Sequence, residues 1–297
     1  MIRIGVNQDV FHRKTSGFPS FEDMIRGVAD LGLNLYEFCP EYPEQTPTAL
    51  TRTRRRQAVA LANSLGVKLI VHASFFCTNI CMIHDGMRKE AVRQLKREIQ
   101  LAHDLESDVI TIHPGPPGGH SRWYPEEDAW GMMARSYQEL LKCAAPLGVR
   151  VCTENMVSSA FPSASGTLAC LERIFAIADV PHFGLTFDFG HHNLIHNGLP
   201  IPQRTQKAID ILRRFHGRIW VLHIHDNQGE RDDHAAVGTG QLDYDTLMPE
   251  VFRLHIQAYW SMELYGWEAI APCKNRVAAY AEKAPRQRDS LHKADER

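Results

Sequence analysis

Eight short apolar runs, each followed by a longer segment of helical periodicity, constrain the fold of this chain more than any other feature. Their starts lie about 31 to 41 residues apart, which is the length of one strand–helix unit. The runs occupy residues 2–7, 33–39, 67–72, 108–113, 148–154, 183–188, 218–225 and 256–263. Eight such units in 297 residues predict an α/β fold, a single (β/α)8 TIM barrel.

The segments between the runs carry apolar residues at helical spacing. Residues 88–106 place them three or four positions apart, at Val92, Leu95, Ile99, Ala102 and Leu105. No linker or change of composition divides the chain, so residues 1–283 are predicted to form one catalytic barrel. Residues 284–297 are charged and aperiodic, and we expect them to form a flexible tail.

The overall composition excludes several classes of partner. Net charge is −2 and charged residues make up 23% of the chain, so no general basic field attracts nucleic acid or anionic lipid. Contact with nucleic acid would have to be local. No run of eighteen apolar residues and no basic, then apolar, leader is present, so we expect no membrane partner. Seven cysteines without a CxxC pair fit a reduced compartment and predict a cytoplasmic protein.

Acidic and imidazole side chains occupy the ends of six of the eight runs. These residues are His72, His113, Glu154, Asp188, His223 and Glu263. The carboxyl ends of parallel barrel strands all lie on one face, where enzymes of this fold keep their sites. Several carboxylates that converge there would repel one another without a cation. The pattern therefore predicts a bound divalent metal.

Period-two alternation predicts which strand residues face the barrel. In the seventh run the helix-facing residues would be Trp220, Leu222 and Ile224, and the barrel-facing residues Val221, His223 and His225. In the sixth run, Leu185 and Phe187 would face outward and Asp188 inward.

The seventh run leads into the stretch HIHDNQGERDDHAAVGTG, residues 223–240. It divides into the strand end at His223, a turn, and a D-x-H hook made by Asp232 and His234, with Asp233 as an intervening residue that is not a ligand. Each piece alone has an ordinary explanation as a core histidine or a turn. The joint occurrence at six strand ends favours a metal site.

These residues carry a resemblance that covers nearly the whole chain. The sequence resembles the xylose isomerase-like TIM barrel superfamily, which includes endonuclease IV and many sugar isomerases and epimerases. The matching motifs, in the family order, are VHASFF, IHPG, TEN, FDFGH, HIHDN, DDHAAVGTG and MELYG. The resemblance to endonuclease IV implies three metal groups: His72, His113 and Glu154; Glu154, Asp188, His223 and Glu263; and His191, Asp232 and His234.

The resemblance supports two activities. The first hypothesis is a multi-metal phosphoester hydrolase acting on a small phosphodiester or an abasic nucleic acid, with Glu154 bridging two ions. The alternative is a sugar or sugar phosphate isomerase or epimerase with one metal. There Glu154 and Glu263 would be the catalytic acid/base pair, and His191 would bind substrate. A third class, a metal-binding barrel without catalysis, has no specific feature in its favour.

Details of the motifs bear on this choice. DFGH, HIHDNQ and DDH replace the DTCH-, HLNDSK- and DRH-like forms usual in endonuclease IV, although the ligand positions survive. Several epimerases have an arginine where this chain has His234, four residues before Gly238, which favours a third metal. The imidazole and carboxylate donors suit one to three ions, with Zn²⁺ preferred and Mn²⁺ or Fe²⁺ also suitable.

Some neighbouring residues are predicted to support the site or touch substrate: His225, Asp226 and Phe75. A basic cluster, Arg52, Arg54, Arg55 and Arg56, lies at the start of the second predicted helix. It is interpreted as a solvated helix face, with a phosphate clamp as the alternative.

Overall fold

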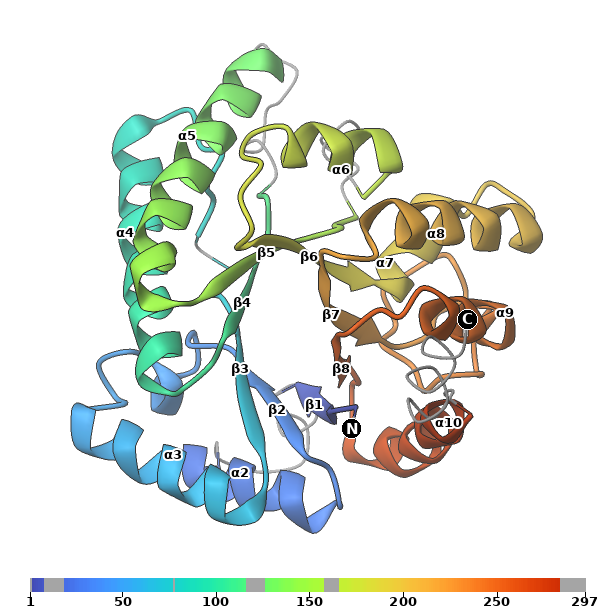
Figure 1. Ribbon diagram of the computed structural model, residues 1–297, viewed down its shortest axis with the longest axis horizontal. Helices are drawn as coiled ribbons and strands as arrows, with labels where there is room; N and C mark the ends of the chain where they lie inside the picture. The colour runs from blue at the N-terminus through green and yellow to red at the C-terminus, as the bar shows by residue number, and fades with distance from the viewer. Residues whose placement is uncertain (1, 8–18, 77, 116–125, 158–165, 284–297) are drawn as a thin grey trace, which may run out of the picture.

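The computed structural model is a closed barrel of eight parallel strands in the order β1 to β8 (Figure 1). It describes residues 2–7, 19–76, 78–115, 126–157 and 166–283. The strands are β1 Ile4–Asn7, β2 Leu35–Phe38, β3 Lys68–His72, β4 Val109–Ile112, β5 Arg150–Glu154, β6 Phe183–Asp188, β7 Ile219–Ile224 and β8 Tyr259–Met262. The predicted (β/α)8 barrel is confirmed.

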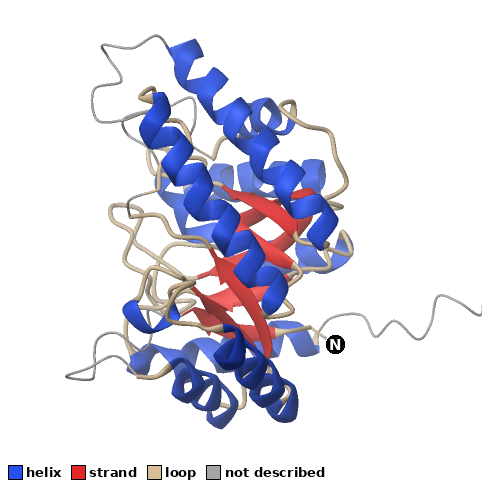
Figure 2. Cartoon of the chain, turned by 90° about the vertical axis from the view of Figure 1, so that its left-hand side faces the viewer, coloured by secondary structure: helices blue, strands red, loops and turns tan. Residues whose placement is uncertain are grey.

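Helices surround the strands on the outside of the barrel (Figure 2). In the described part of the chain they are α2 Phe21–Asp30, α3 Arg52–Leu65, α4 Asp85–Asp104, α5 Glu126–Ala144, α6 Leu168–Phe175, α7 Phe189–Ile195, α8 Ile201–Phe215, α9 Tyr244–Arg253 and α10 Ile270–Glu282. The apolar residues predicted for α4 are all buried, because that stripe of the helix packs onto the barrel. No described helix is long and apolar enough to cross a membrane.

Alternation holds for most of the barrel wall but fails at one residue. Leu185 and Phe187 pack outward with the helices as predicted. Trp220 was predicted to face the helices, but it packs inside the barrel in one cluster with Val221. The register between β6 and β7 shifts between Leu185 and Thr186, so Trp220 has no paired residue on β6. The side chains of Trp220 and Val221 therefore both point into the barrel. The prediction for Trp220 is therefore wrong.

Four strands, β2, β4, β7 and β8, end one residue earlier than predicted, and two of these shifts concern candidate site residues. His113 and Glu263 each follow the last residue of a strand rather than ending it. The first residues after a strand still lie on the same face of the barrel, so both side chains remain at the rim. The predicted tail at 284–297 lies outside the described residues.

Candidate metal centre

Each of the eight strands delivers one polar side chain to the carboxyl end of the barrel, either from its last residues or from the residue that follows. They are Asn7, Glu37, His72, His113, Glu154, Asp188, His223 and Glu263. His113 is half-buried and the other seven are buried. The six predicted strand-end residues are thus brought together, and the two remaining strands add an amide and a carboxylate.

Glu154 lies at the centre of the cluster, and its two oxygens face different neighbours. Oε2 is 3.2 Å from Nε2 of His72 and 3.2 Å from Nε2 of His113. Oε1 is 3.1 Å from Nδ1 of His191 and 3.4 Å from Nδ1 of His223. A carboxylate in this position is able to serve two adjacent metal groups at once.

The predicted residues fall into the predicted groups. Ligand atoms lie within 4.8 Å of one another in each of these sets: His72, His113 and Glu154; Glu154, Asp188, His223 and Glu263; and His191, Asp232 and His234. Asp233 stays outside and faces Arg231 at 3.8 Å. A further set of the same kind joins His225, His234 and Glu263.

The central group has the donor set of a cation site. Nδ1 of His223 is buried and has no hydrogen-bond partner among the described residues. It lies 3.4 Å from Glu154, 3.6 Å from Asp188 and 3.5 Å from Glu263. An imidazole nitrogen that faces three carboxylates matches what divalent transition metals take from proteins. The residues present therefore fit a metal.

The two glutamates of the central group differ in acidity. Burial raises the pKa of Glu154, but the charges of His223 and His113, together with hydrogen bonds from His113 and His191, hold the pKa well below its ordinary value. Burial also raises the pKa of Glu263, and for Glu263 the net shift stays upward because Glu154 and Asp188 repel its charge. Opposite shifts in paired carboxyls are a common feature of acid and base partners.

The sixth strand and the helix after it fix Asp188 firmly. Its carboxylate Oδ1 accepts the backbone N–H of His191 at 2.6 Å, which caps the start of α7. The side chain of Asn155 accepts the backbone N–H of Asp188 at 2.6 Å and donates to its carbonyl at 2.8 Å. The TEN motif thus supplies both a candidate ligand and the amide that holds the next strand in place.

His225 connects Asp188 to the third group. Its Nε2 lies 3.1 Å from both carboxylate oxygens of Asp188. Its ring stacks on that of His234 with centroids 4.2 Å apart and planes 5° apart. Gly190 provides the space, since a Cβ there would lie 2.0 Å from the His225 ring. These contacts place His225 against a candidate ligand, and its supporting role stays a prediction.

Asp226 explains why the loop after β7 needs its GTG segment. The buried carboxylate accepts the backbone N–H groups of Asn227 at 2.9 Å, Gly238 at 2.9 Å and Leu242 at 3.2 Å. Gly238 has a φ of +84°, and a Cβ on Gly240 would lie 2.2 Å from the carboxylate. The loop is therefore wrapped around Asp226, which places the D-x-H hook.

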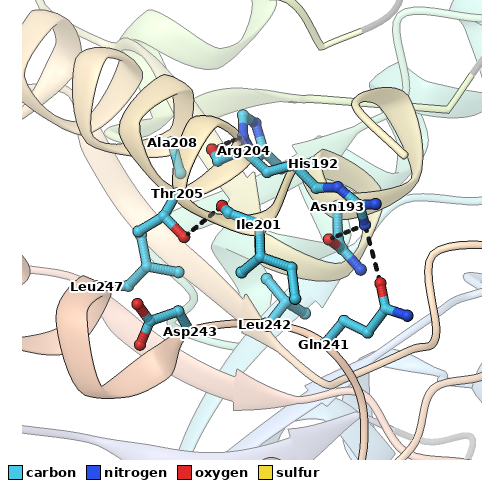
Figure 3. A pocket seen from close by; sticks show the side chains of 10 residues that line it. All are labelled: His192, Asn193, Ile201, Arg204, Thr205, Ala208, Gln241, Leu242, Asp243 and Leu247. Carbon is cyan, nitrogen blue, oxygen red and sulfur yellow. Dashed lines mark hydrogen bonds between the residues drawn. The ribbon is translucent and has the colours of Figure 1, made fainter. Parts of the chain in front are cut away.

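A pocket lined by residues of α7, α8 and the loop after β7 shows which contacts support that loop (Figure 3). Arg204 on α8 donates to the side-chain oxygens of Asn193 and Gln241, both at 3.1 Å. His192 contacts this wall and not the centre, since its Nε2 bonds to the backbone of Arg204 at 3.0 Å. Burial lowers the pKa of His192 to about 3. Of the two adjacent histidines, only His191 belongs to the metal groups.

Phe75 packs against two histidines of the first group. Its ring is 5.4 Å from that of His72 and 5.0 Å from that of His113, at the edge of the first group. Two of the four arginines of the cluster form ion pairs away from the centre. Arg54 pairs with Glu22 at 3.0 Å, and Arg55 pairs with Asp104 at 2.5 Å. These contacts favour a structural role for Arg54 and Arg55 over a phosphate clamp.

Sequence reasoning missed Glu37, Asn7 and Asn155. Glu37 is fully buried and lies 3.2 Å from Nε2 of His223, while Asn7 donates to Glu263 at 3.1 Å. The available signal was a glutamate inside the apolar run LYEF and an asparagine at the end of the first run. A charged residue within a strand that is otherwise buried requires a partner.

A family model described as "Xylose isomerase-like TIM barrel" matches residues 25–285. The chain belongs to that family. The protein MJ1311 of Methanocaldococcus jannaschii, which is uncharacterized, is 26% identical over 205 residues, 66% of this chain and 64% of its own. The chain thus spans just under two thirds of the length of that relative.

Two solved structures show the same fold over nearly the whole chain. A D-tagatose 3-epimerase-like protein has a TM-score of 0.77 at 21% identity and covers 95% of this chain and 97% of its own. An L-ribulose 3-epimerase has a TM-score of 0.72 at 18% identity, over 97% and 88% of the two chains. At these identities the likeness establishes the fold and leaves the activity to be argued from the site.

Proposed function

We propose that the protein is a metal-dependent isomerase or epimerase of a ketose-type sugar. The observation that carries this proposal is the central group, in which Glu154 and Glu263 accompany the metal-ligand types of Asp188 and His223 within 4.8 Å. The two glutamates come from β5 and β8, three strands apart around the barrel. A sugar bound between them would have a carboxyl group on each side.

The family and the relatives support this proposal. The family is described as xylose isomerase-like, and both structural relatives described above are named for epimerisation at carbon 3 of a ketose. Hydrolysis, the first hypothesis from the sequence, becomes the second candidate, since both named structural relatives are epimerases or epimerase-like.

When bound, a divalent metal would polarise the carbonyl oxygen and the neighbouring hydroxyl of the sugar. Asp188 and His223 would hold it from β6 and β7. Glu154 would remove the proton from the carbon beside the carbonyl, since its carboxylate is the more acidic and stays ionised. Glu263, whose pKa is raised, would return a proton on the opposite face. His191 would donate to a sugar oxygen.

Proton exchange from solvent tests the reaction directly. Metal-loaded protein is incubated in deuterated water with free and phosphorylated ketopentoses and ketohexoses, and deuterium at the carbon beside the carbonyl is measured by mass spectrometry. Glu154→Gln and Glu263→Gln should each lower turnover at least about 100-fold. The control is Glu250→Gln on α9, which pairs with Arg213 far from the centre. Absence of exchange with every ketose would refute the proposal.

Phosphoester hydrolysis is the second candidate, and one observation favours it. Glu154 presents one oxygen to the His72–His113 pair and the other to His223 and His191, as a carboxylate bridging two ions would. Metal content per chain separates the candidates, because about three ions favour hydrolysis and one favours isomerisation. With three ions bound, hydrolysis of bis(p-nitrophenyl) phosphate or nicking of an abasic duplex should be lost in His234→Ala.

A further inference from the structure

Glu37 is a buried carboxylate that lies outside the metal groups. It is fully buried on β2, with its side chain inside the barrel and its backbone level with Asn7 of β1. Its two oxygens lie 3.3 and 3.2 Å from Nε2 of His223, which reaches across the barrel from β7. The pair thus joins two strands that are three apart around the barrel.

The two nitrogens of His223 have opposite surroundings. Nε2 faces the carboxylate of Glu37, whereas Nδ1 faces Glu154, Asp188 and Glu263 at 3.4 to 3.6 Å. An imidazole that binds a metal through one nitrogen is neutral and keeps one N–H on the other nitrogen, and an ionised carboxylate only accepts hydrogen bonds. The proton therefore belongs on Nε2, toward Glu37. This leaves the lone pair of Nδ1 directed at the central group.

We propose that Glu37 is a positioning residue that fixes the tautomer and orientation of His223 so that Nδ1 is presented to a metal. Carboxylate–histidine–metal arrangements of this kind hold the ring and raise the basicity of the ligand nitrogen. Glu37 acts only through His223, because it does not belong to the set of ligand atoms that lie within 4.8 Å of one another. The inference rests on the metal of the proposed function and not on its sugar chemistry.

A purely structural role accounts poorly for a carboxylate at this position. Among the described residues, the charges of His223 and His72 and the hydroxyl of Ser261 offset the burial of Glu37, and its ion pair is with His223 and not with a lysine or arginine. Removing an ionised carboxylate from water costs several kcal/mol, so a barrel interior that only needed filling would be served better by an apolar residue. A charged carboxylate at this position is explained if it sets the tautomer of His223.

The test measures metal binding without any sugar. Zn²⁺ affinity is determined by competition with a chromophoric chelator for wild type, Glu37→Gln and Glu37→Leu. The matched control is Thr111→Val, which removes a fully buried hydroxyl of the barrel interior that bonds to Thr186 at 2.8 Å. We expect Glu37→Leu to bind Zn²⁺ about 10- to 100-fold more weakly, Glu37→Gln to lie between, and the control to match wild type.

Nitrogen-15 NMR of the Zn²⁺-loaded protein gives a second measurement, the ring N–H signal of His223. A loss of packing alone would not change this signal. Wild type should show a slowly exchanging Nε2–H of His223, and Glu37→Leu should lose it while its other histidine signals persist. If Glu37→Leu does not fold, Glu37→Gln has nearly the same shape and carries the test. Equal affinity and an unchanged signal in both variants would overturn the inference, as would an equal loss in Thr111→Val.

The outcome for Glu37 can be distinguished from the outcome for the proposed function. Wild type that binds Zn²⁺ but exchanges no ketose proton contradicts the function, and a loss of affinity in the Glu37 variants still supports this inference. Wild type that exchanges protons while the Glu37 variants bind metal normally contradicts only the inference. Wild type that binds no divalent metal contradicts both.

Discussion

Replacing Asp226 tests whether one buried carboxylate organises the loop after β7. In Asp226→Ala the backbone N–H groups of Asn227, Gly238 and Leu242 lose their acceptor. An unpaired buried donor costs about 1–3 kcal/mol. The three costs do not add fully, because the opened loop admits water. We therefore expect about 4 kcal/mol of lost local stability, which corresponds to roughly a 1000-fold rise in opening.

The conservative substitution should cost less. Asp226→Asn keeps one accepting oxygen and turns an amide N–H₂ toward at least one of the three donors, so we expect about 2 kcal/mol, or roughly 30-fold. The assay is amide hydrogen exchange followed by mass spectrometry on peptides that span residues 226–242. Glu230→Gln is the matched control, since Glu230 is an exposed carboxylate of the same loop.

Two results would refute this reasoning. Unchanged exchange across residues 226–242 in Asp226→Ala would mean that the three hydrogen bonds contribute nothing to the loop. Equal acceleration throughout the barrel would mean that Asp226 supports the global fold and not the loop that places Asp232 and His234.

Three further predictions concern the histidines, a glycine and the arginine cluster. Burial lowers the pKa values of His72 and His234, but nearby carboxylates outweigh it and raise both to about 9. In metal-stripped protein, these two histidines should therefore contribute fully to the free energy of unfolding below about pH 6.5, and the contribution should be lost as pH rises through about 9. A urea midpoint that is the same at about pH 6.5 and about pH 9.5 would contradict this. Gly190→Ala places a Cβ 2.0 Å from the ring of His225, so chelator competition should show at least about 10-fold weaker metal binding; normal affinity would mean that the ring position is unimportant. Arg55→Met breaks an ion pair and two bonds to backbone carbonyls, so it should lower the free energy of unfolding by about 1–3 kcal/mol without changing turnover; lost turnover at normal stability would instead support a phosphate clamp.

Much of the candidate site could be predicted because strand ends in a parallel barrel share one face. That rule turns residues as distant in sequence as His72 and Glu263 into neighbours without any knowledge of packing. The D-x-H hook was also predictable, but only through the resemblance to a family. No local pattern in DDHAAVGTG shows that Asp232 turns toward His191 while Asp233 turns away.

The sequence by itself determined the eight-unit barrel, the polar face and the residue types gathered there, because periodicity and strand ends are local properties. Tertiary structure alone decided the position of Trp220, since the register shift arises where β6 pairs with β7. It also decided the partner of Glu37, because His223 lies 186 residues away in the sequence. Which buried charge meets which imidazole depends on closure of the sheet, and closure is a property of the whole barrel.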